Sequence, residues 1–154
     1  MGNWNAPTPP YHLSVVAPIN RRRGNRILLV EDDHVLTQMY KLSLLLHGFL
    51  VDVAPDGEAG IQRVANGQQP DAIVLDMGLP RVNRRVPRRD GLAMLSALRS
   101  TFSTKRIPVV VLASDPLDFA DVMELGATVC LARWRSTAKD LTGKLDEILH
   151  PFHG

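Results

Sequence analysis

Short apolar runs alternate along this chain with longer stretches in which hydrophobic residues recur every three or four positions. The clearest runs cover residues 27–30, 72–75 and 109–112, and each is rich in branched side chains. Continuous apolar runs of this length are typical of strands that are buried on both faces of a parallel sheet. The pattern therefore predicts an α/β domain.

The remaining elements follow from the helical period and from capping residues. We expect further strands over 49–54 and 129–132, and helices over 35–46, 56–66, 92–100, 117–125 and 137–149. Gly48, Gly67 and Gly126 follow three of these helices, where a left-handed glycine commonly ends a helix. The apolar face predicted for the first helix comprises Val35, Met39, Leu42 and Leu46. Alternating strands and helices with short links predict a doubly wound, five-stranded parallel sheet.

Length and composition indicate one domain. The chain has 154 residues, of which 45% are hydrophobic, and this suffices for one core. Residues 1–25 carry four prolines and the basic run Arg21-Arg22-Arg23, without a sustained hydrophobic period. Because proline removes a backbone donor and fixes φ, we expect residues 1–25 to form an extended, flexible tail before a domain over 26–154.

Charge and cysteine content narrow the class of protein. The net charge is only +2, so the chain carries no global signature of nucleic-acid binding. Cys130 is the only cysteine, which excludes a disulfide framework and favours a reducing compartment. No apolar run approaches the roughly 20 residues that span a bilayer, and the N-terminus lacks the order of a signal peptide. We therefore expect a soluble, cytoplasmic protein without a membrane partner.

Two of the apolar runs end in acidic residues. Glu31, Asp32 and Asp33 follow the first run, and Asp76 ends the third predicted strand. Ligand sites of open α/β sheets lie beyond the carboxyl ends of the strands, where these acids fall. Carboxylates that converge there repel one another unless a cation joins them, and oxygen ligands suit Mg²⁺. The residues thus predict an Mg²⁺-dependent site that accepts a phosphoryl group, although Asp32 and Asp33 are also suited to capping the next helix.

Five short motifs in order make a resemblance specific. They are Ile-Leu-Leu-Val-Glu-Asp-Asp at 27–33, Asp-Ala-Ile-Val-Leu-Asp-Met-Gly-Leu-Pro at 71–80, Asp-Gly at 90–91, Ile-Pro-Val-Val-Val-Leu at 107–112 and Leu-Gly-Ala at 125–127. With them, residues 26 to about 152 resemble the receiver domain of two-component response regulators, of the CheY-like superfamily. The resemblance implies a flavodoxin-like (βα)5 fold.

The resemblance also implies roles for individual residues. Asp76 occupies the position of the aspartate that accepts a phosphoryl group from a histidine kinase. Glu31 and Asp32 match the acidic pair of the family, so Asp32 would bind Mg²⁺ directly and Glu31 would help through water. Gly78, two residues beyond the phosphoacceptor, would give its main-chain carbonyl to the metal. The implied metal site is therefore Glu31, Asp32, Asp76 and Gly78.

Several family positions hold unusual residues. Ala113 stands where receivers carry the Thr or Ser whose hydroxyl bonds the phosphoryl group, and Ser114 next to it should point to the opposite face unless the strand bulges. Arg133 aligns with the family lysine, with Trp134 in place of the usual proline, and its planar fork is not equivalent to a compact ammonium. Cys130 takes the position of the aromatic switch residue. We therefore expect a weakened output switch.

A basic insertion lies beside the predicted site. Receivers usually place two residues between the positions of Pro80 and Asp90, whereas this chain has nine, residues 81–89, five of them arginine. A solvated, extended loop is the default interpretation. The functional alternative is a docking patch for an acidic protein surface, or an electrostatic funnel for an anionic phosphodonor. Nucleic-acid binding by this loop is disfavoured, because no aromatic residues or reading helix accompany it.

Two classes of function remain. The first is a stand-alone receiver, not an enzyme, that accepts a phosphoryl group on Asp76 in a two-component phosphorelay. Its partners would be a sensor histidine kinase or a phosphotransfer protein and an unknown output protein. The alternative is a degenerate receiver that acts as a phosphorylation-independent interaction module. A hydrolase with an aspartyl-phosphate intermediate is disfavoured, because no second catalytic acid follows Asp76 closely.

Overall fold

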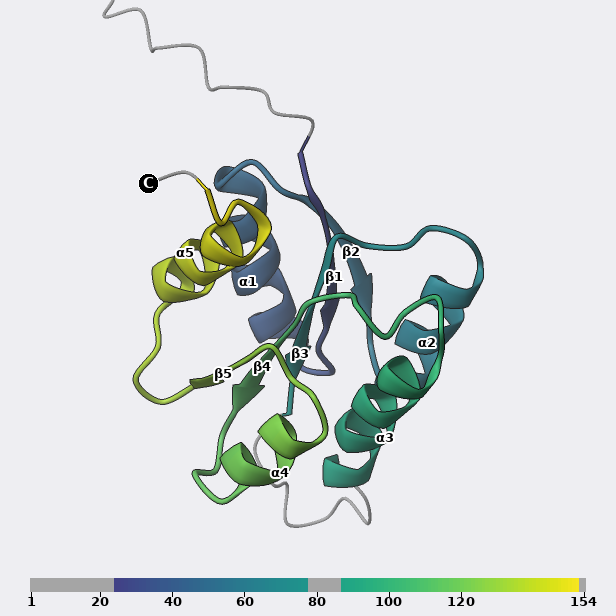
Figure 1. Ribbon diagram of the computed structural model, residues 1–154. Coiled ribbons are helices and arrows are strands. Elements are labelled where there is room, and N and C mark those ends of the chain that lie inside the picture. Colours follow the sequence, from purple (N-terminus) through teal and green to yellow (C-terminus); the bar gives the residue numbers. More distant parts are fainter. Residues whose placement is uncertain (1–23, 78–86, 153–154) are drawn as a thin grey trace, which may run out of the picture.

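The computed structural model describes residues 24–77 and 87–152, and within them it forms one five-stranded sheet. The strands are β1 (Arg26–Val30), β2 (Leu50–Ala54), β3 (Ala72–Asp76), β4 (Val109–Ala113) and β5 (Val129–Ala132). The helices are α1 (His34–Leu46), α2 (Gly57–Ala65), α3 (Pro87–Ser100), α4 (Asp118–Glu124) and α5 (Ala138–Leu149). The sheet is parallel, in the order β2-β1-β3-β4-β5 (Figure 1). The predicted flavodoxin-like (βα)5 fold is confirmed.

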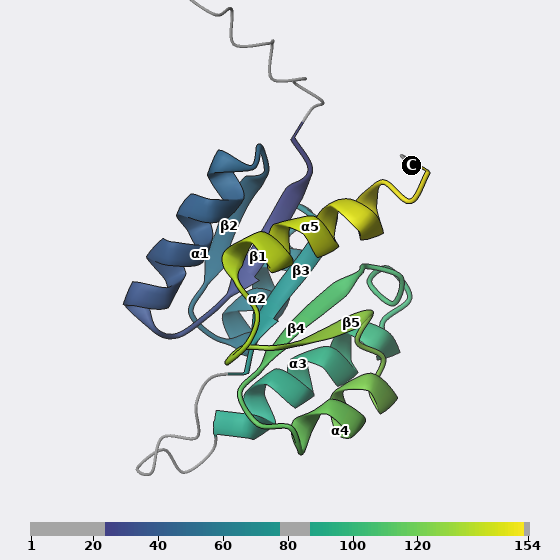
Figure 2. The ribbon, with the colours of Figure 1, turned by 90° about the vertical axis from the view of Figure 1, so that its left-hand side faces the viewer.

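The helices cover both faces of the sheet. Helices α1 and α5 lie on one face, and α2, α3 and α4 lie on the other (Figures 1 and 2). Successive residues of β1 enter opposite cores, because strand side chains alternate: Ile27 and Leu29 pack with α1 and α5, whereas Leu28 and Val30 pack with the other three helices. Burial on both faces explains why the central strands are continuous apolar runs.

Capping interactions define the helix ends. Asp33 caps α1, and its side chain accepts a hydrogen bond from the Leu36 amide at 2.9 Å; the capping interpretation of Asp33 is therefore confirmed. Asp56 caps α2, and its side chain accepts a hydrogen bond from the Ala59 amide at 2.8 Å. Gly48, Gly67 and Gly126 have φ of 103°, 94° and 100°, as expected for glycines that end helices. Apart from the start of α3, the predicted boundaries agree with the structure to within one residue.

Helix α1 is turned differently from our prediction. The face that packs on the sheet consists of Thr37, Tyr40 and Leu44. The predicted apolar face is exposed instead, and it comprises Val35, Met39, Leu42 and Leu46. The error arose because both sets recur at a helical spacing, so periodicity alone did not choose between them. A polar contact with the end of β1 accompanies the observed rotation: the buried Thr37 hydroxyl lies 3.5 Å from the Glu31 carbonyl.

Helix α3 begins earlier than predicted. We expected it to start at residue 92 after a loop over 81–89, but the backbone is helical from Pro87. Proline favours the first turn of a helix, because its φ is already helical and the missing N–H has no partner there. The end of the arginine-rich insertion is therefore helical rather than extended. Residues 81–86 lie outside the described residues, as does the expected tail before residue 24, so the proposed electrostatic role of the insertion stays a prediction.

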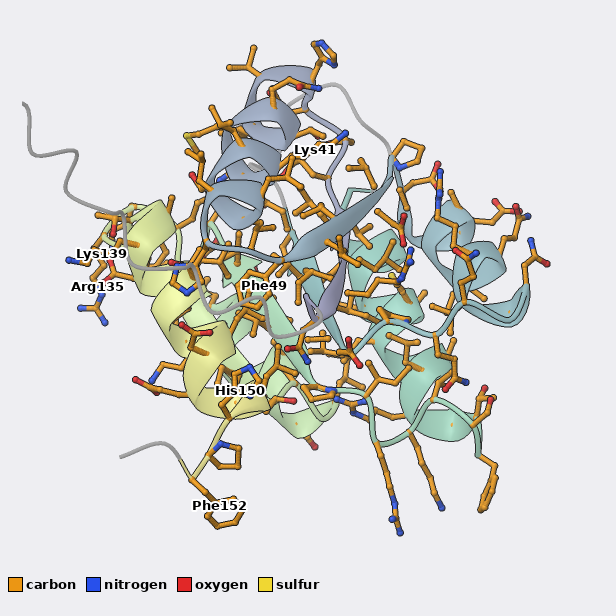
Figure 3. The ribbon with its side chains drawn as sticks, turned by 90° about the horizontal axis from the view of Figure 1, so that it is seen from above. Lys41, Phe49, Arg135, Lys139, His150 and Phe152 are labelled. Atoms are coloured by element: carbon orange, nitrogen blue, oxygen red, sulfur yellow. The ribbon has the colours of Figure 1, made fainter. Side chains whose placement is uncertain are left out.

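Helices α1 and α5 are also joined at the amino end of the sheet. His47 Nε2 lies 2.5 Å from a carboxylate oxygen of Asp146 on α5, and the His47 ring stacks on Phe49 with the ring centroids 5.3 Å apart. Figure 3 views the molecule from this end and shows Phe49 between α1 and α5. In the described part of the chain, no helix is long and apolar enough to cross a membrane.

The rotation of α1 gives a direct test. Replacing buried Leu44 (0% exposed) with alanine should lower the free energy of unfolding by about 2–5 kcal/mol, because it leaves a cavity against the sheet. Leu42→Ala, at a position that is 59% exposed, should change it by less than about 0.5 kcal/mol. Urea unfolding of the two variants measures both values. The opposite order would mean that the predicted face, and not the observed one, packs on the core.

Candidate functional site

The carboxyl ends of four strands bring the candidate residues together. In the sheet register Val30 of β1 lies beside Leu75 of β3, Asp76 beside Leu112 of β4, and Ala113 beside Ala132 of β5. Glu31, Asp76, Ser114 and Arg133 therefore lie at one edge of the sheet, at or just beyond the ends of these strands. This is the edge at which open α/β sheets bind their ligands.

Asp76 and Arg133 form a buried ion pair at this edge. The Asp76 side chain is fully buried, and its Oδ1 lies 3.1 Å from a terminal guanidinium nitrogen of Arg133, whose side chain is 13% exposed. The Arg133 main chain is fixed as well, because its N–H donates to the Ala113 carbonyl at 2.9 Å. The predicted phosphoacceptor and the residue at the family lysine position are therefore in direct contact.

Glu31 is buried beside this pair. Its residue is 4% exposed, and Oε1 accepts a hydrogen bond from the Asp33 amide at 2.8 Å, whereas buried Oε2 has no hydrogen-bond partner among the described residues. Burial raises the pKa of Glu31 to about 9, and the neighbouring Asp76 carboxyl adds to the rise. The Asp33 amide and the Arg133 charge oppose this shift. Two acids thus share one guanidinium, and one of them is held protonated near neutral pH.

This arrangement suits a small, hard cation. Glu31 and Asp76 together can carry two negative charges, whereas only one positive charge, that of Arg133, lies beside them. A bound cation would supply a second positive charge and allow both acids to ionise. Asp32 is exposed on the loop between β1 and α1, and Gly78 lies outside the described residues. Within the described ranges, no group of three or more His, Cys, Asp and Glu side chains is arranged to hold a metal. The ligand set of Glu31, Asp32, Asp76 and Gly78 therefore stays a prediction, of which the structure brings Glu31 and Asp76 together.

The unusual family positions also lie at this edge. Ala113 is fully buried at the end of β4 and presents no hydroxyl. Ser114 follows the last residue of the strand, so strand alternation does not fix its direction, and its Oγ lies 3.4 Å from the Arg133 nitrogen that contacts Asp76. The sequence did not predict this contact. Burial raises the pKa of the Cys130 thiol to about 11, with the nearby Asp118 charge adding to the rise, so the thiol is neutral.

Tyr40 is a site residue that sequence reasoning missed. It projects from the buried face of α1. Burial raises the pKa of its phenol, the Asp76 charge adds to the rise, and Arg133 opposes it through its charge and a side-chain hydrogen bond. The hydroxyl therefore lies next to the Asp76–Arg133 pair. Tyr40 is the only tyrosine of α1, and a lone phenol in the helix after the acidic loop was the signal that could have identified it.

The pKa of Glu31 gives a prediction about stability. Between its ordinary value of 4.5 and its value of about 9, the folded protein keeps a proton that the unfolded chain releases. Without divalent cations, the free energy of unfolding should therefore fall as the pH rises through this range. Glu31→Gln should remove much of the fall, because glutamine binds no proton. Urea unfolding at pH 5 and 8.5 in a chelator measures it, with Glu124→Gln on the surface of α4 as the control. Parallel pH profiles of wild type and Glu31→Gln would contradict the assignment.

Comparisons with known proteins identify the family of this chain. The family model of the response regulator receiver domain matches residues 27–142. Response regulator MprA of Mycobacterium sp. (strain KMS) is 37% identical over 89 residues, which are 58% of this chain and 34% of that protein. The same protein of Mycobacterium leprae (strain TN) is also 37% identical over 89 residues, or 35% of its length. The matched segment thus spans about a third of these relatives.

Solved structures show the same fold. A putative response regulator from Chloroflexus aurantiacus has a TM-score of 0.69 at 27% identity, covering 82% of this chain and 98% of that one. The receiver domain of the sensor histidine kinase PA1611 from Pseudomonas aeruginosa, with a magnesium ion coordinated in its active site cleft, has a TM-score of 0.68 with the same identity and coverage. Because the family model matches residues 27–142, this chain belongs to the response regulator receiver domain family.

Proposed function

We propose that this domain accepts a phosphoryl group on Asp76 from a sensor histidine kinase or a phosphotransfer protein, and that it signals by contact with another protein. The observation that carries the proposal is the buried Asp76 carboxylate, held 3.1 Å from Arg133 at the carboxyl end of β3. A buried carboxylate with a fixed cation beside it is an oriented nucleophile. The role is that of a signalling module and not of an enzyme with a substrate of its own.

In phosphoryl transfer to Asp76, the protein contributes mainly the positions of the reacting groups and the charges around them. An oxygen of the Asp76 carboxylate attacks the donor phosphorus, while the bond from phosphorus to the leaving nitrogen or oxygen of the donor breaks. The electron pair of that bond stays with the leaving group. Arg133 holds the carboxylate in position and offsets the negative charge that gathers during transfer. Glu31 and Tyr40 bound the reacting carboxylate and exclude water, since both are buried.

The proposal includes magnesium, because a bound cation would balance the second negative charge of Glu31 and Asp76. Glu31, Asp32, Asp76 and the Gly78 carbonyl would hold it. When bound, Mg²⁺ would neutralise charge on the transferring phosphoryl group. The chain's own contribution is to hold the carboxyl groups of Glu31 and Asp76 buried next to each other, ready for it.

The exposed face of α1 supplies a surface for the donor protein. Val35, Met39, Leu42 and Leu46 are exposed and recur at intervals of four, three and four residues. Apolar residues at this spacing form the stripe along which one helix packs against another. Helix α1 follows the acidic loop directly, so its amino end borders the Asp76 edge of the sheet. A donor that presents its phosphohistidine on a helix fits both features.

The phosphorylation-independent interaction module remains the second candidate. Ala113 presents no hydroxyl to a phosphoryl group, and Cys130 has no ring to swing between two positions. The α1 face would serve such a module equally well. Our expectations of a cytoplasmic location and of no direct contact with nucleic acid stay predictions.

Phosphorylation of Asp76 can be measured by intact mass. With acetyl phosphate and Mg²⁺ the mass of the wild type should rise by one phosphoryl group. Asp76→Asn should abolish the gain, because an amide is not a nucleophile of this kind. Asp121→Asn, an exposed acid on α4, is the matched control and should keep the gain. Gain in Asp76→Asn would reject the site, and no gain in the wild type would leave the interaction module as the function.

Magnesium binding can be tested without phosphorylation. Titration with Mg²⁺ should shift the amide NMR signals of residues 31–33 and 76–78, because the predicted ligands lie there. Asp32→Asn should weaken this binding severely, since it removes a charged ligand. Glu147→Gln, an exposed acid on α5, should leave it unchanged. Shifts confined to other surface acids would show that the ion does not bind at this edge.

A further inference from the structure

A stripe of exposed apolar side chains on α1 lies close to the point where the chain enters the domain. This α1 stripe consists of Val35, Met39, Leu42 and Leu46, whose exposed fractions range from 45% to 79%. Helix α1 ends at the same end of the sheet at which β1 begins (Figure 1). A segment that precedes β1 and folds back from this end would therefore lie along the helix.

The entry point is held against the turn between α1 and β2. The Asn25 carbonyl accepts a hydrogen bond from the Leu50 amide at 3.0 Å, so residue 25 prolongs the pairing of β1 with β2. Gly24 lies against the same turn, because a Cβ added to it would be 2.6 Å from the Gly48 carbonyl oxygen. A side chain at residue 24 would force the two backbones apart. The entry point is thus fixed beside Gly48, two residues after the end of α1.

The sequence before Gly24 contains one segment whose apolar spacing matches the α1 stripe. Tyr11, Leu13 and Val15 alternate with polar residues. In an extended chain, alternate side chains point to one face and recur every 6–7 Å or so, because each residue rises by about 3.3 Å. Along α1, residues three or four apart recur every 4.5–6 Å or so, because each helical residue rises by about 1.5 Å. Three side chains of the extended segment can therefore contact successive side chains of the stripe.

The chain between this segment and the entry point is long enough for the contact. Val15 lies nine residues before Gly24, and nine extended residues span at most about 30 Å. Helix α1 has 13 residues and is therefore about 20 Å long. A short tether keeps a segment near its site at an effective concentration on the order of millimolar. A contact that is weak between separate molecules is therefore well populated within one chain.

We propose that residues 11–15 of this chain dock in an extended conformation along the α1 stripe and cover it. The contact removes apolar side chains of both elements from water, which is the favourable term. It leaves the alternate, polar side chains of the segment facing solvent. The docking itself needs no phosphoryl group. Its consequence rests on the proposed function: a donor protein that binds the α1 stripe has to displace the segment first.

A paramagnetic label can detect this contact in the whole chain. The label is attached to Ser14→Cys, on the polar side of the segment, in a Cys130→Ala background that leaves a single thiol. Amide NMR signals of residues 39–46 should lose most of their intensity relative to the same protein with the label reduced. Signals of α4, which lies on the other face of the sheet, should keep theirs (Figure 2).

Substitutions in the α1 stripe and in the segment test whether the contact is specific. Leu42→Ser combined with Leu46→Ser should restore the α1 signals, because both side chains are exposed and their loss leaves the core intact. Leu13→Ser in the segment should restore them as well. Met123→Ser, at an exposed apolar position of α4, is the matched control and should leave the broadening unchanged.

Two results would overturn the inference. The first is broadening of the α1 signals that survives the double substitution in the stripe. The second is broadening that spreads evenly over the surface or that centres on another element. The measurement uses no phosphoryl donor, so its failure leaves the proposed phosphorylation of Asp76 untouched. A wild type without mass gain would in turn leave the docking of residues 11–15 in place.

Discussion

The site depends on an imbalance of buried charge: two carboxyl groups and one guanidinium meet at the carboxyl end of an apolar sheet. Asp76 is paired with Arg133, and Glu31 beside them stays neutral only by keeping a proton. Taking charges out of water costs free energy that an ion pair recovers only in part, so this cluster does not stabilise the fold. The apolar cores on both sides of the sheet have to offset it, and the strands that form them end at the cluster.

The parts of the fold that the sequence predicts well are those with one physical solution. A run such as residues 72–75 can be buried on both faces only as a central strand, and a glycine such as Gly126 with φ of 100° ends a helix for a steric reason. The rotation of α1 had two solutions, because its aliphatic residues surround much of the helix. Contacts such as that between Asp76 and Arg133 join strands far apart in the chain, so spacing alone could suggest their roles but not their distance.

In the sequence, the unusual residues are separate departures from the family pattern. In the structure, they lie near one another. Ala113 and Cys130 lack the groups that the family resemblance implies, and Arg133 replaces the compact cation. Around them, the longer and planar arginine reaches Asp76 and Ser114 with one nitrogen. Positions that lack a contact of the family thus lie beside Arg133, whose side chain makes a different one.

Helix α1 connects the site to the surface, because one of its faces packs against the sheet and the site while the other is exposed to solvent. Its buried face is partly polar: the Thr37 hydroxyl lies 3.5 Å from the carbonyl of Glu31, and Tyr40 lies beside the Asp76–Arg133 pair. Satisfying these groups turns the aliphatic residues of the helix outward, where large apolar side chains gain nothing from water. This exposed apolar stripe is the surface that we propose for the donor protein. The polar groups of the buried site thus influence which side of α1 faces solvent.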